Sequence, residues 1–187
     1  ATGSNNFIQG SVANDTVLRA RAGGDLVIGV GSTIRMRVDE VGLVTKPNNV
    51  SFMVRANGNQ SYSGGAIFIP SSPVTTGVCH NIGGHFNTST GVFTAPVAGR
   101  YYLSMDTGIS FQSDGAHDGW QISIQKNGSN SEIYDQLYPG GANNNEDHIQ
   151  ADGIFNLAAS DQIRWSMNGY GQGMTFAGMK FQGYLLG

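Results

Sequence analysis

Residues 86–103 of this sequence read FNTSTGVFTAPVAGRYYL, and this stretch decides the fold. Its two β-rich runs predict two consecutive strands with a corner between them. Pro96 at the corner cannot donate to a strand ladder, and Gly99 relieves the change of direction. After the corner, every second residue from Tyr101 to Met105 is large and apolar, which predicts that these side chains enter the core. The stretch is therefore typical of one corner of a β-sandwich.

The rest of the chain has the composition and the apolar–polar alternation of an all-β protein. Glycine reaches 28 residues while charged residues make up 12%, so the sequence is rich in turns and poor in the residues that cover helix surfaces. Alternating runs recur after residue 50 without a helical period. They predict strands at residues 51–55, 66–69, 91–94, 100–111, 120–126, 148–157, 162–167 and 175–186. This number of strands indicates a sandwich.

The N-terminal quarter has shorter runs, which predict small strands at residues 7–9, 16–21, 26–28 and 33–38. Such a segment is too short, and has too few apolar residues, to bury both faces of a sheet by itself. We expect three copies to wrap about one axis as an intertwined β shaft. Its arginines would then stay solvated: Arg19, Arg21, Arg35 and Arg37. The alternative is a β-hairpin extension that packs on the main domain.

The domain boundary is predicted next to Pro47, because proline disfavours a central strand and the paired asparagines that follow suit a turn. Residues 1–46 would form the shaft and trimerisation segment, and residues 47–187 the head. The sequence begins with Ala1 rather than methionine, so we expect it to continue an upstream fibre shaft.

Several classes of function are disfavoured. The formal net charge is −3 and the ten Lys and Arg residues are scattered, so we expect no nucleic-acid partner. No run approaches the roughly 18 apolar residues of a membrane helix, so we expect no membrane insertion. The four histidines are dispersed and no catalytic motif occurs, so we expect no enzymatic activity. Cys79 is the one cysteine and has no partner for an intrachain disulfide.

The corner sequence resembles the aromatic signature of C1q domains, in which Phe86, Phe93, Gly99 and Tyr101 fall at the family's spacing. Residues 151–163 are similar to its strand, turn and strand, and residues 176–186 resemble its final strand. Departures lie at Leu103 and Met105, where aromatic residues are usual, and at Thr75, where a Phe is expected. The resemblance implies a C1q/TNF-like jelly roll of about ten strands. It also implies a homotrimer with apolar strands along the threefold axis and ligand contacts made by loops at the exposed end.

Residues 25–29 and 35–44 resemble short shaft segments of bacteriophage tail fibres, and the collagen-like Gly-X-Y stalk of many animal C1q proteins is absent. The leading hypothesis is therefore a phage virion protein. It would be the distal, trimeric tip of a tail fibre, which binds a glycan or protein receptor on the bacterial surface. The alternative is a secreted or surface C1q-like protein of a cell, which would be extracellular. A fibre-borne glycan hydrolase is a third hypothesis with less support.

Three predicted loops, at residues 112–119, 137–146 and 168–174, carry the candidate receptor contacts. Asparagine side chains hydrogen-bond to sugar hydroxyls, and aromatic faces stack on sugar rings. The candidates are His117, Trp120, Tyr138, Asn143, Asn144 and Tyr170. The alternative is that Gly and Asn simply make good turns here and that Trp120 begins a core strand.

Acidic residues accumulate in the same region, and threefold symmetry would multiply their charge. Calcium takes several carboxylate and carbonyl oxygens, and it is the one cofactor that this region suggests. The candidate ligands are Asp114, Asp118, Asp135 and Asp147. No Asp-x-Asp-x-Asp-Gly loop is present, so solvated acidic loops are the alternative.

Overall fold

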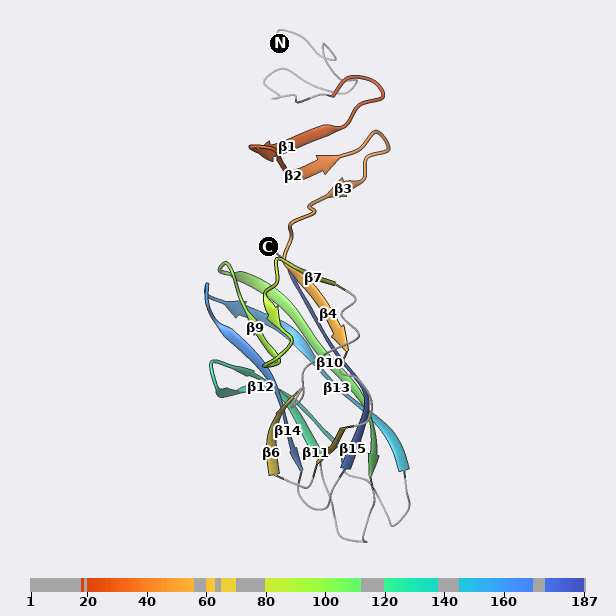
Figure 1. Ribbon diagram of the computed structural model, residues 1–187, viewed down its shortest axis with the longest axis vertical. Helices are drawn as coiled ribbons and strands as arrows, with labels where there is room; N and C mark the ends of the chain where they lie inside the picture. Colours follow the sequence, from red (N-terminus) through yellow and green to blue (C-terminus); the bar gives the residue numbers. More distant parts are fainter. Residues whose placement is uncertain are drawn as a thin grey trace. The chain divides into compact units, whose positions relative to one another are not determined.

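The computed structural model describes residues 18, 20–55, 60–62, 65–69, 80–111, 120–137, 145–169 and 174–186 (Figure 1). Within them, it describes side chains for residues 18, 20–55, 80–108, 121–129, 148–166 and 178–186. The chain divides into two compact units, Ala1–Asn49 and Val50–Gly187. All regular secondary structure over the described ranges is β-strand, so none of these residues lies in a helix that could cross a membrane.

The first unit contains a three-stranded antiparallel sheet, β1(Leu26–Val30), β2(Thr33–Val38) and β3(Val44–Thr45), in the order β1-β2-β3. Asp39 shapes the turn before β3, because its Oδ1 accepts hydrogen bonds from the backbone N–H groups of Val41 (3.1 Å) and Leu43 (2.8 Å). The predicted strand at residues 7–9 lies outside the described residues. The predicted strand at 16–21 is wrong for its described members Leu18, Ala20 and Arg21, which pair with no strand.

The second unit is a sandwich of two antiparallel sheets. One sheet has the order β13-β10-β15-β4-β7, with β5 beside β15. The other has the order β12-β11-β14-β9-β8, with β6 beside β14. The strands are β4(Ser51–Arg55), β5(Gln60–Tyr62), β6(Gly65–Ile69), β7(His80–Ile82), β8(Phe86–Asn87), β9(Val92–Thr94), β10(Gly99–Phe111), β11(Trp120–Lys126), β12(Ser129–Leu137), β13(Asn145–Leu157), β14(Gln162–Gly169) and β15(Met174–Leu185).

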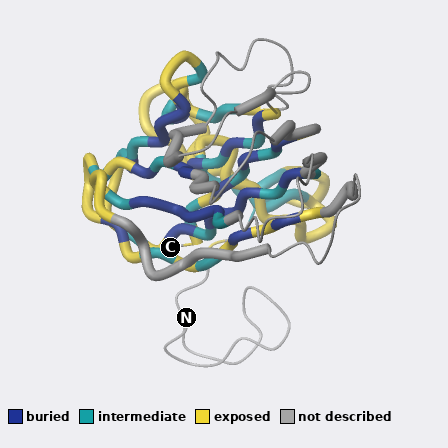
Figure 2. Tube along the Cα trace, turned by 90° about the horizontal axis from the view of Figure 1, so that it is seen from below, coloured by how far each residue is buried: buried dark blue, intermediate teal, exposed yellow. Residues whose placement is uncertain are grey.

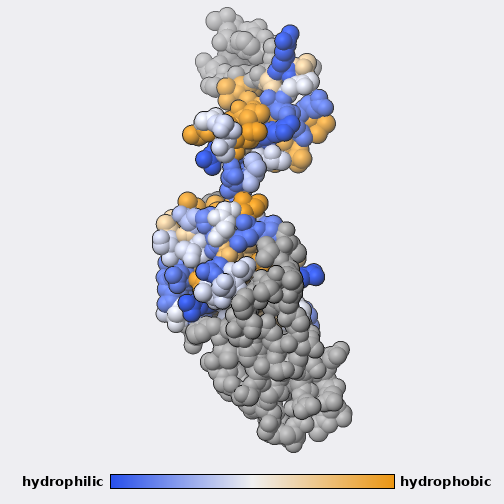
Figure 3. All heavy atoms as spheres, viewed as in Figure 1, coloured by the Kyte–Doolittle hydropathy of each residue, from blue (hydrophilic) through white to orange (hydrophobic). Residues whose placement is uncertain are grey.

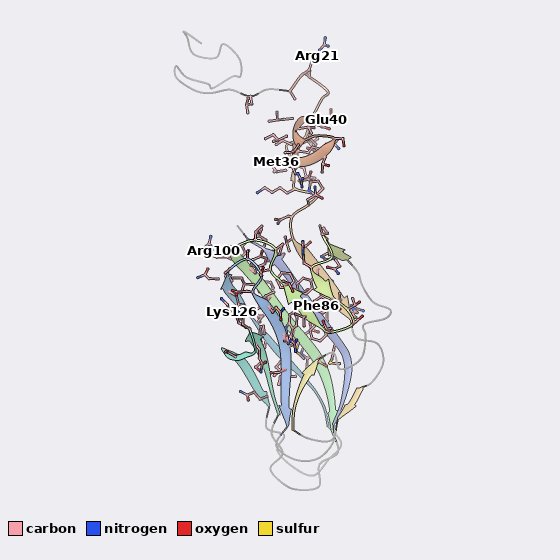
Figure 4. All side chains as sticks on the ribbon, turned by 60° about the vertical axis from the view of Figure 1, so that its left-hand side comes forward. Arg21, Met36, Glu40, Phe86, Arg100 and Lys126 are labelled. Atoms are coloured by element: carbon pink, nitrogen blue, oxygen red, sulfur yellow. The ribbon has the colours of Figure 1, made fainter. Side chains whose placement is uncertain are left out.

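Aromatic rings fill the space between the two sheets. Phe52 stacks on Phe86 and Phe93 with ring centroids 5.0 and 4.9 Å apart, and Trp165 lies 5.1 Å from Phe181. These rings come from both sheets, so their packing holds the layers together. Buried residues lie along strands of the sandwich in Figure 2, and the labelled Phe86 lies within the sandwich in Figure 4.

The predicted corner is confirmed, with β9 and β10 on either side of it. Tyr101, Leu103 and Met105 are all fully buried, as the alternation predicts. The Tyr101 hydroxyl donates a hydrogen bond to the carbonyl oxygen of Val97 (2.9 Å) across the corner, which satisfies its polar end inside the core. The all-β class and the jelly-roll arrangement agree with the sequence prediction.

Candidate binding end and assembly face

Six strand ends of the sandwich gather at one end, which we call the far end. In the first sheet, Phe111 at the end of β10 pairs with Asn145 of β13 and Met174 of β15. In the second sheet, Trp120 at the start of β11 pairs with Leu137 of β12 and Gly169 of β14. These six residues are the points where the chain enters and leaves the three segments that carry the predicted receptor contacts.

The unit begins and ends at the opposite end, which we call the near end. The backbone N–H of Leu185 donates to the carbonyl oxygen of Val50 (3.0 Å), and Tyr184 pairs with Ser51 at the start of β4. The strand β15 runs from Met174 at the far end to Leu185 at the near end. At about 3.3 Å per residue, these two ends lie on the order of 35 Å apart.

The predicted receptor residues are only partly within the described structure. His117, Tyr138, Asn143, Asn144 and Tyr170 lie outside the described residues. Trp120 lies at the start of β11, where the backbone is described but the side chain is not. Its position at the start of a strand agrees with the alternative that it begins a core strand.

The four predicted calcium ligands are not brought together by any described contact. Asp114 and Asp118 lie outside the described residues. Asp135 pairs with Ile122 in the second sheet, whereas Asp147 pairs with Ile109 in the first sheet, and neither side chain is described. Over the described ranges, no three His, Cys, Asp or Glu side chains are grouped so as to hold a metal ion. Calcium binding stays a prediction.

The outward side of the sheet β13-β10-β15-β4-β7, which we call the outer face, carries an apolar row. Tyr102 pairs with Ile154 on one side and with Tyr184 on the other, and the row continues through Ser51 to Ile82. The rings of Tyr102 and Tyr184 lie 5.4 Å apart. Ile154 is 62% exposed and Tyr184 46% exposed. Ile154, Tyr102 and Tyr184 therefore form an apolar cluster on the outer face, two of whose members are exposed.

The outer face becomes charged farther along the same strands. Asp106 Oδ2 lies 2.5 Å from Lys180 Nζ, and Asp106 Oδ1 lies 4.0 Å from His148 Nε2. The amide of Gln150 donates to Asp152 Oδ1 (3.1 Å). The face therefore combines an apolar part near the chain ends with a polar part toward the far end.

Another group of polar contacts, which we call the near-end clamp, ties two turns together. Asp161 accepts hydrogen bonds from Lys126 Nζ (2.7 Å), the side-chain amide of Asn127 (2.7 Å) and the backbone N–H of Ala158 (2.8 Å). The Lys126 contact, followed by the Asn127 and Ala158 hydrogen bonds, lowers the pKa of Asp161 to about 2. Asn127 also accepts a hydrogen bond from the backbone N–H of Gln162, so its side chain bonds to both members of the second turn, Asp161 and Gln162.

Sequence reasoning did not identify the outer face. Alternation along β10 shows that the two tyrosines at 101 and 102 must point to opposite sides, and this was an available signal for an exposed Tyr102. The pairing that places Tyr102 between Ile154 and Tyr184 joins distant parts of the chain, and no local pattern gives it.

The sequence profile of the C1q domain family matches residues 51–186, which is nearly all of the second unit. The chain belongs to the C1q domain family. The C1q domain thus includes both sheets, the far end and the outer face. No curated protein sequence matches the chain.

Two solved structures illustrate the likeness of this C1q domain to known folds. The globular domain of zebrafish complement 1qA protein matches with a TM-score of 0.48 and 16% identity, over 74% of this chain and 98% of that chain. The Eiger TNF of S. frugiperda matches with a TM-score of 0.53 and 11% identity, over 75% of this chain and 94% of that chain. At this level of identity, the likeness to Eiger TNF shows a shared jelly-roll fold.

Proposed function

We propose that this protein is a homotrimeric, non-catalytic binding protein that forms the distal tip of a bacteriophage tail fibre. The single observation that supports this most is the polarity of the C1q domain. The chain enters at the near end, and the six strand ends that flank the predicted receptor loops lie on the order of 35 Å away at the far end. A tip needs this arrangement, with its attachment at one end and its binding loops at the other.

The outer face supports the trimer. Ile154 and Tyr184 together leave on the order of 200 Å² of side chain exposed. At about 25 cal/mol per Å², covering that area would contribute about 5 kcal/mol per protomer before the entropic cost of association. Three copies around a threefold axis can cover this row in a closed ring, without leaving an open surface that would extend into a filament.

Trimerisation would also serve binding. Three sites that face one cell surface act together, so weak individual affinities give a long-lived attachment. A bacterial surface glycan suits the asparagine and aromatic content of residues 112–119, 137–146 and 168–174, and it remains our proposal for the receptor. The N-terminal β-rich unit, with its likeness in sequence to tail-fibre shafts, is the reason for placing the protein on a virion.

Two measurements test this proposal. Sedimentation equilibrium should give three times the chain mass, and a monomer would count against it. Purified protein added before phage should block adsorption to a sensitive bacterial strain, and a glycan array should identify the sugar. Binding to a matrix component of an animal or bacterial cell, without any effect on phage adsorption, would favour the secreted or cell-surface alternative.

A further inference from the structure

Up to the irregularity between β1 and β2, one face of the sheet of the first unit carries only apolar residues. Cross-strand pairs place Leu26 opposite Val38, Ile28 opposite Met36, and Val38 opposite Val44, and paired residues share a side of a sheet. These five residues make up what we call the apolar face. The opposite side has a different character: Val27 pairs with Arg37, which pairs in turn with Thr45 and forms an ion pair with Asp25.

The apolar face is only partly covered within the described chain, because Leu26, Met36 and Val38 are partly buried and none of its residues is fully buried. Ile28 is 47% exposed and Val44 51% exposed. No residue among 18 and 20–49 is buried, so this sheet has no core of its own. Apolar residues accordingly show as orange on the surface of this unit in Figure 3, and the labelled Met36 lies on β2 in Figure 4. A sheet of three short strands without a covered face is not stable alone in water.

We propose that the apolar face packs against the same face of two further copies of this chain. This inference rests on the trimeric C1q domain proposed above. Only a short stretch separates Thr45 at the end of β3 from Val50 at the start of the domain. A trimer of C1q domains would therefore hold three of these sheets at an effective concentration near the millimolar range, which no separate partner protein matches.

The charges agree with this choice of occupant. With the apolar faces turned toward a common axis, the side with Arg37 and Asp25 turns toward water and keeps its ion pair there. Arg35 is also exposed, at the irregularity where β2 carries one residue more than β1. The sheet of residues 26–45 then has a core only in the assembled protein, and it opens when the copies part.

Val27 and Ile28 provide a matched pair of positions for the test. They are neighbours on β1, both are β-branched and both are 47% exposed, but they lie on opposite sides of the sheet. In an isolated sheet, glutamate at either position would have a similar, small effect. In the trimer, Ile28→Glu would bring three carboxylates into an apolar layer, whereas Val27→Glu would lie beside Arg37 in water.

The experiment is limited trypsin digestion of the protein. Mass spectrometry measures the rate of cleavage after Arg35 and Arg37, and sedimentation measures the oligomeric state. We expect trimeric wild-type protein to be cut slowly at both arginines. Ile28→Glu should remain trimeric through its C1q domains but be cut at least about tenfold faster, which corresponds to about 1.4 kcal/mol of lost protection. Val27→Glu should be cut at the wild-type rate within about twofold.

Each alternative gives a different result. A trimeric wild type that is cut rapidly at Arg35 and Arg37, or equal rates for the two variants, would overturn the inference and leave the trimeric C1q domain intact. A monomeric wild type would refute the proposed function itself. If Tyr184→Glu is monomeric but still resists trypsin at Arg35 and Arg37 as wild type does, the apolar face is covered within its own chain. This result would also overturn the inference.

Discussion

Gly183→Ala is predicted to destabilise the C1q domain although alanine is the better strand residue. Gly183 lies on β15 with Leu103 opposite it on β10 and Phe52 opposite it on β4. Its backbone conformation is one that any residue can adopt, so conformational strain is not the issue. From strand preference alone, replacing glycine by alanine would add about 0.5–1 kcal/mol of stability.

The packing reverses that sign. A Cβ at residue 183 would lie 2.7 Å from Leu103 Cδ2, 2.8 Å from Phe52 Cε1 and 3.0 Å from Phe52 Cζ. Carbon atoms prefer a separation of about 3.5–4.0 Å, so both neighbours would have to move by about 1 Å. Neither has space, because Leu103 is fully buried and Phe52 stacks on Phe86 and Phe93. Overpacking of this kind costs about 1–3 kcal/mol.

The assay is thermal unfolding followed by circular dichroism, at one fixed protein concentration because assembly contributes to the stability of an oligomer. With the gain in strand preference subtracted, the net loss is on the order of 1–2 kcal/mol. A domain of this size loses about 3–4 °C of melting temperature for each kcal/mol, so we expect Gly183→Ala to melt about 3–8 °C below wild type. Leu103→Ala, which removes one of the three contacts, should cost less in the Gly183→Ala background than in wild type, by about 1 kcal/mol. A melting temperature of Gly183→Ala at or above that of wild type would refute the packing argument.

Three further predictions concern the outer face, the near-end clamp and a buried pair of serine hydroxyls. Tyr184→Glu should shift the trimer toward monomer in sedimentation at micromolar protein, because a carboxylate replaces an apolar contact in the row, and an unchanged trimer would exclude this row from the interface. The folded-state pKa of Asp161 lies near 2, below its ordinary value of 3.8, so its ion pair with Lys126 contributes stability that is present above about pH 4 and lost as the pH falls toward 2. The melting temperatures of wild type and Asp161→Asn should therefore differ at pH 6 and converge toward pH 2, whereas a difference that does not change with pH would contradict the ion-pair explanation. Ser123 and Ser166 share a buried hydrogen bond of 2.6 Å, so Ser123→Ala should lower the free energy of chemical unfolding by about 1 kcal/mol. The double alanine variant should lose less than twice that amount. Strictly additive losses would show that the two serines are not coupled.

The fold was largely predictable because its decisive residues are close together in the sequence. Pro96 and Gly99 set the corner, and alternation after it correctly places Tyr101 and Leu103 in the core. The strand β12 was not predicted, because Ser129–Leu137 is mostly polar and lies at the edge of its sheet, so it has no strong alternating pattern. At residues 16–21 the alternating pattern predicts a strand, but the described members Leu18, Ala20 and Arg21 are not part of one.

The outer face could not be predicted from the sequence for a different reason. Its row depends on Ile154, Tyr102 and Tyr184 coming into register, and that register depends on three strands that lie far apart along the chain. A shift of one residue in any of these strands would turn its member of the row, Ile154, Tyr102 or Tyr184, inward. The predicted receptor residues depend instead on local composition, which indicates the chemistry of a loop but not where its side chains lie.

The hydrogen bond between Leu185 and Val50 has a practical consequence for work with this protein. Because the C1q domain starts and finishes at the same place, a fluorescent protein or affinity handle fused after its last strand would emerge beside the entry point of the chain. Such a fusion would leave the far end, which we propose to bind the receptor, unobstructed. The same adjacency would let the domain be inserted as a cassette into a surface turn of an unrelated carrier with little disturbance of either fold.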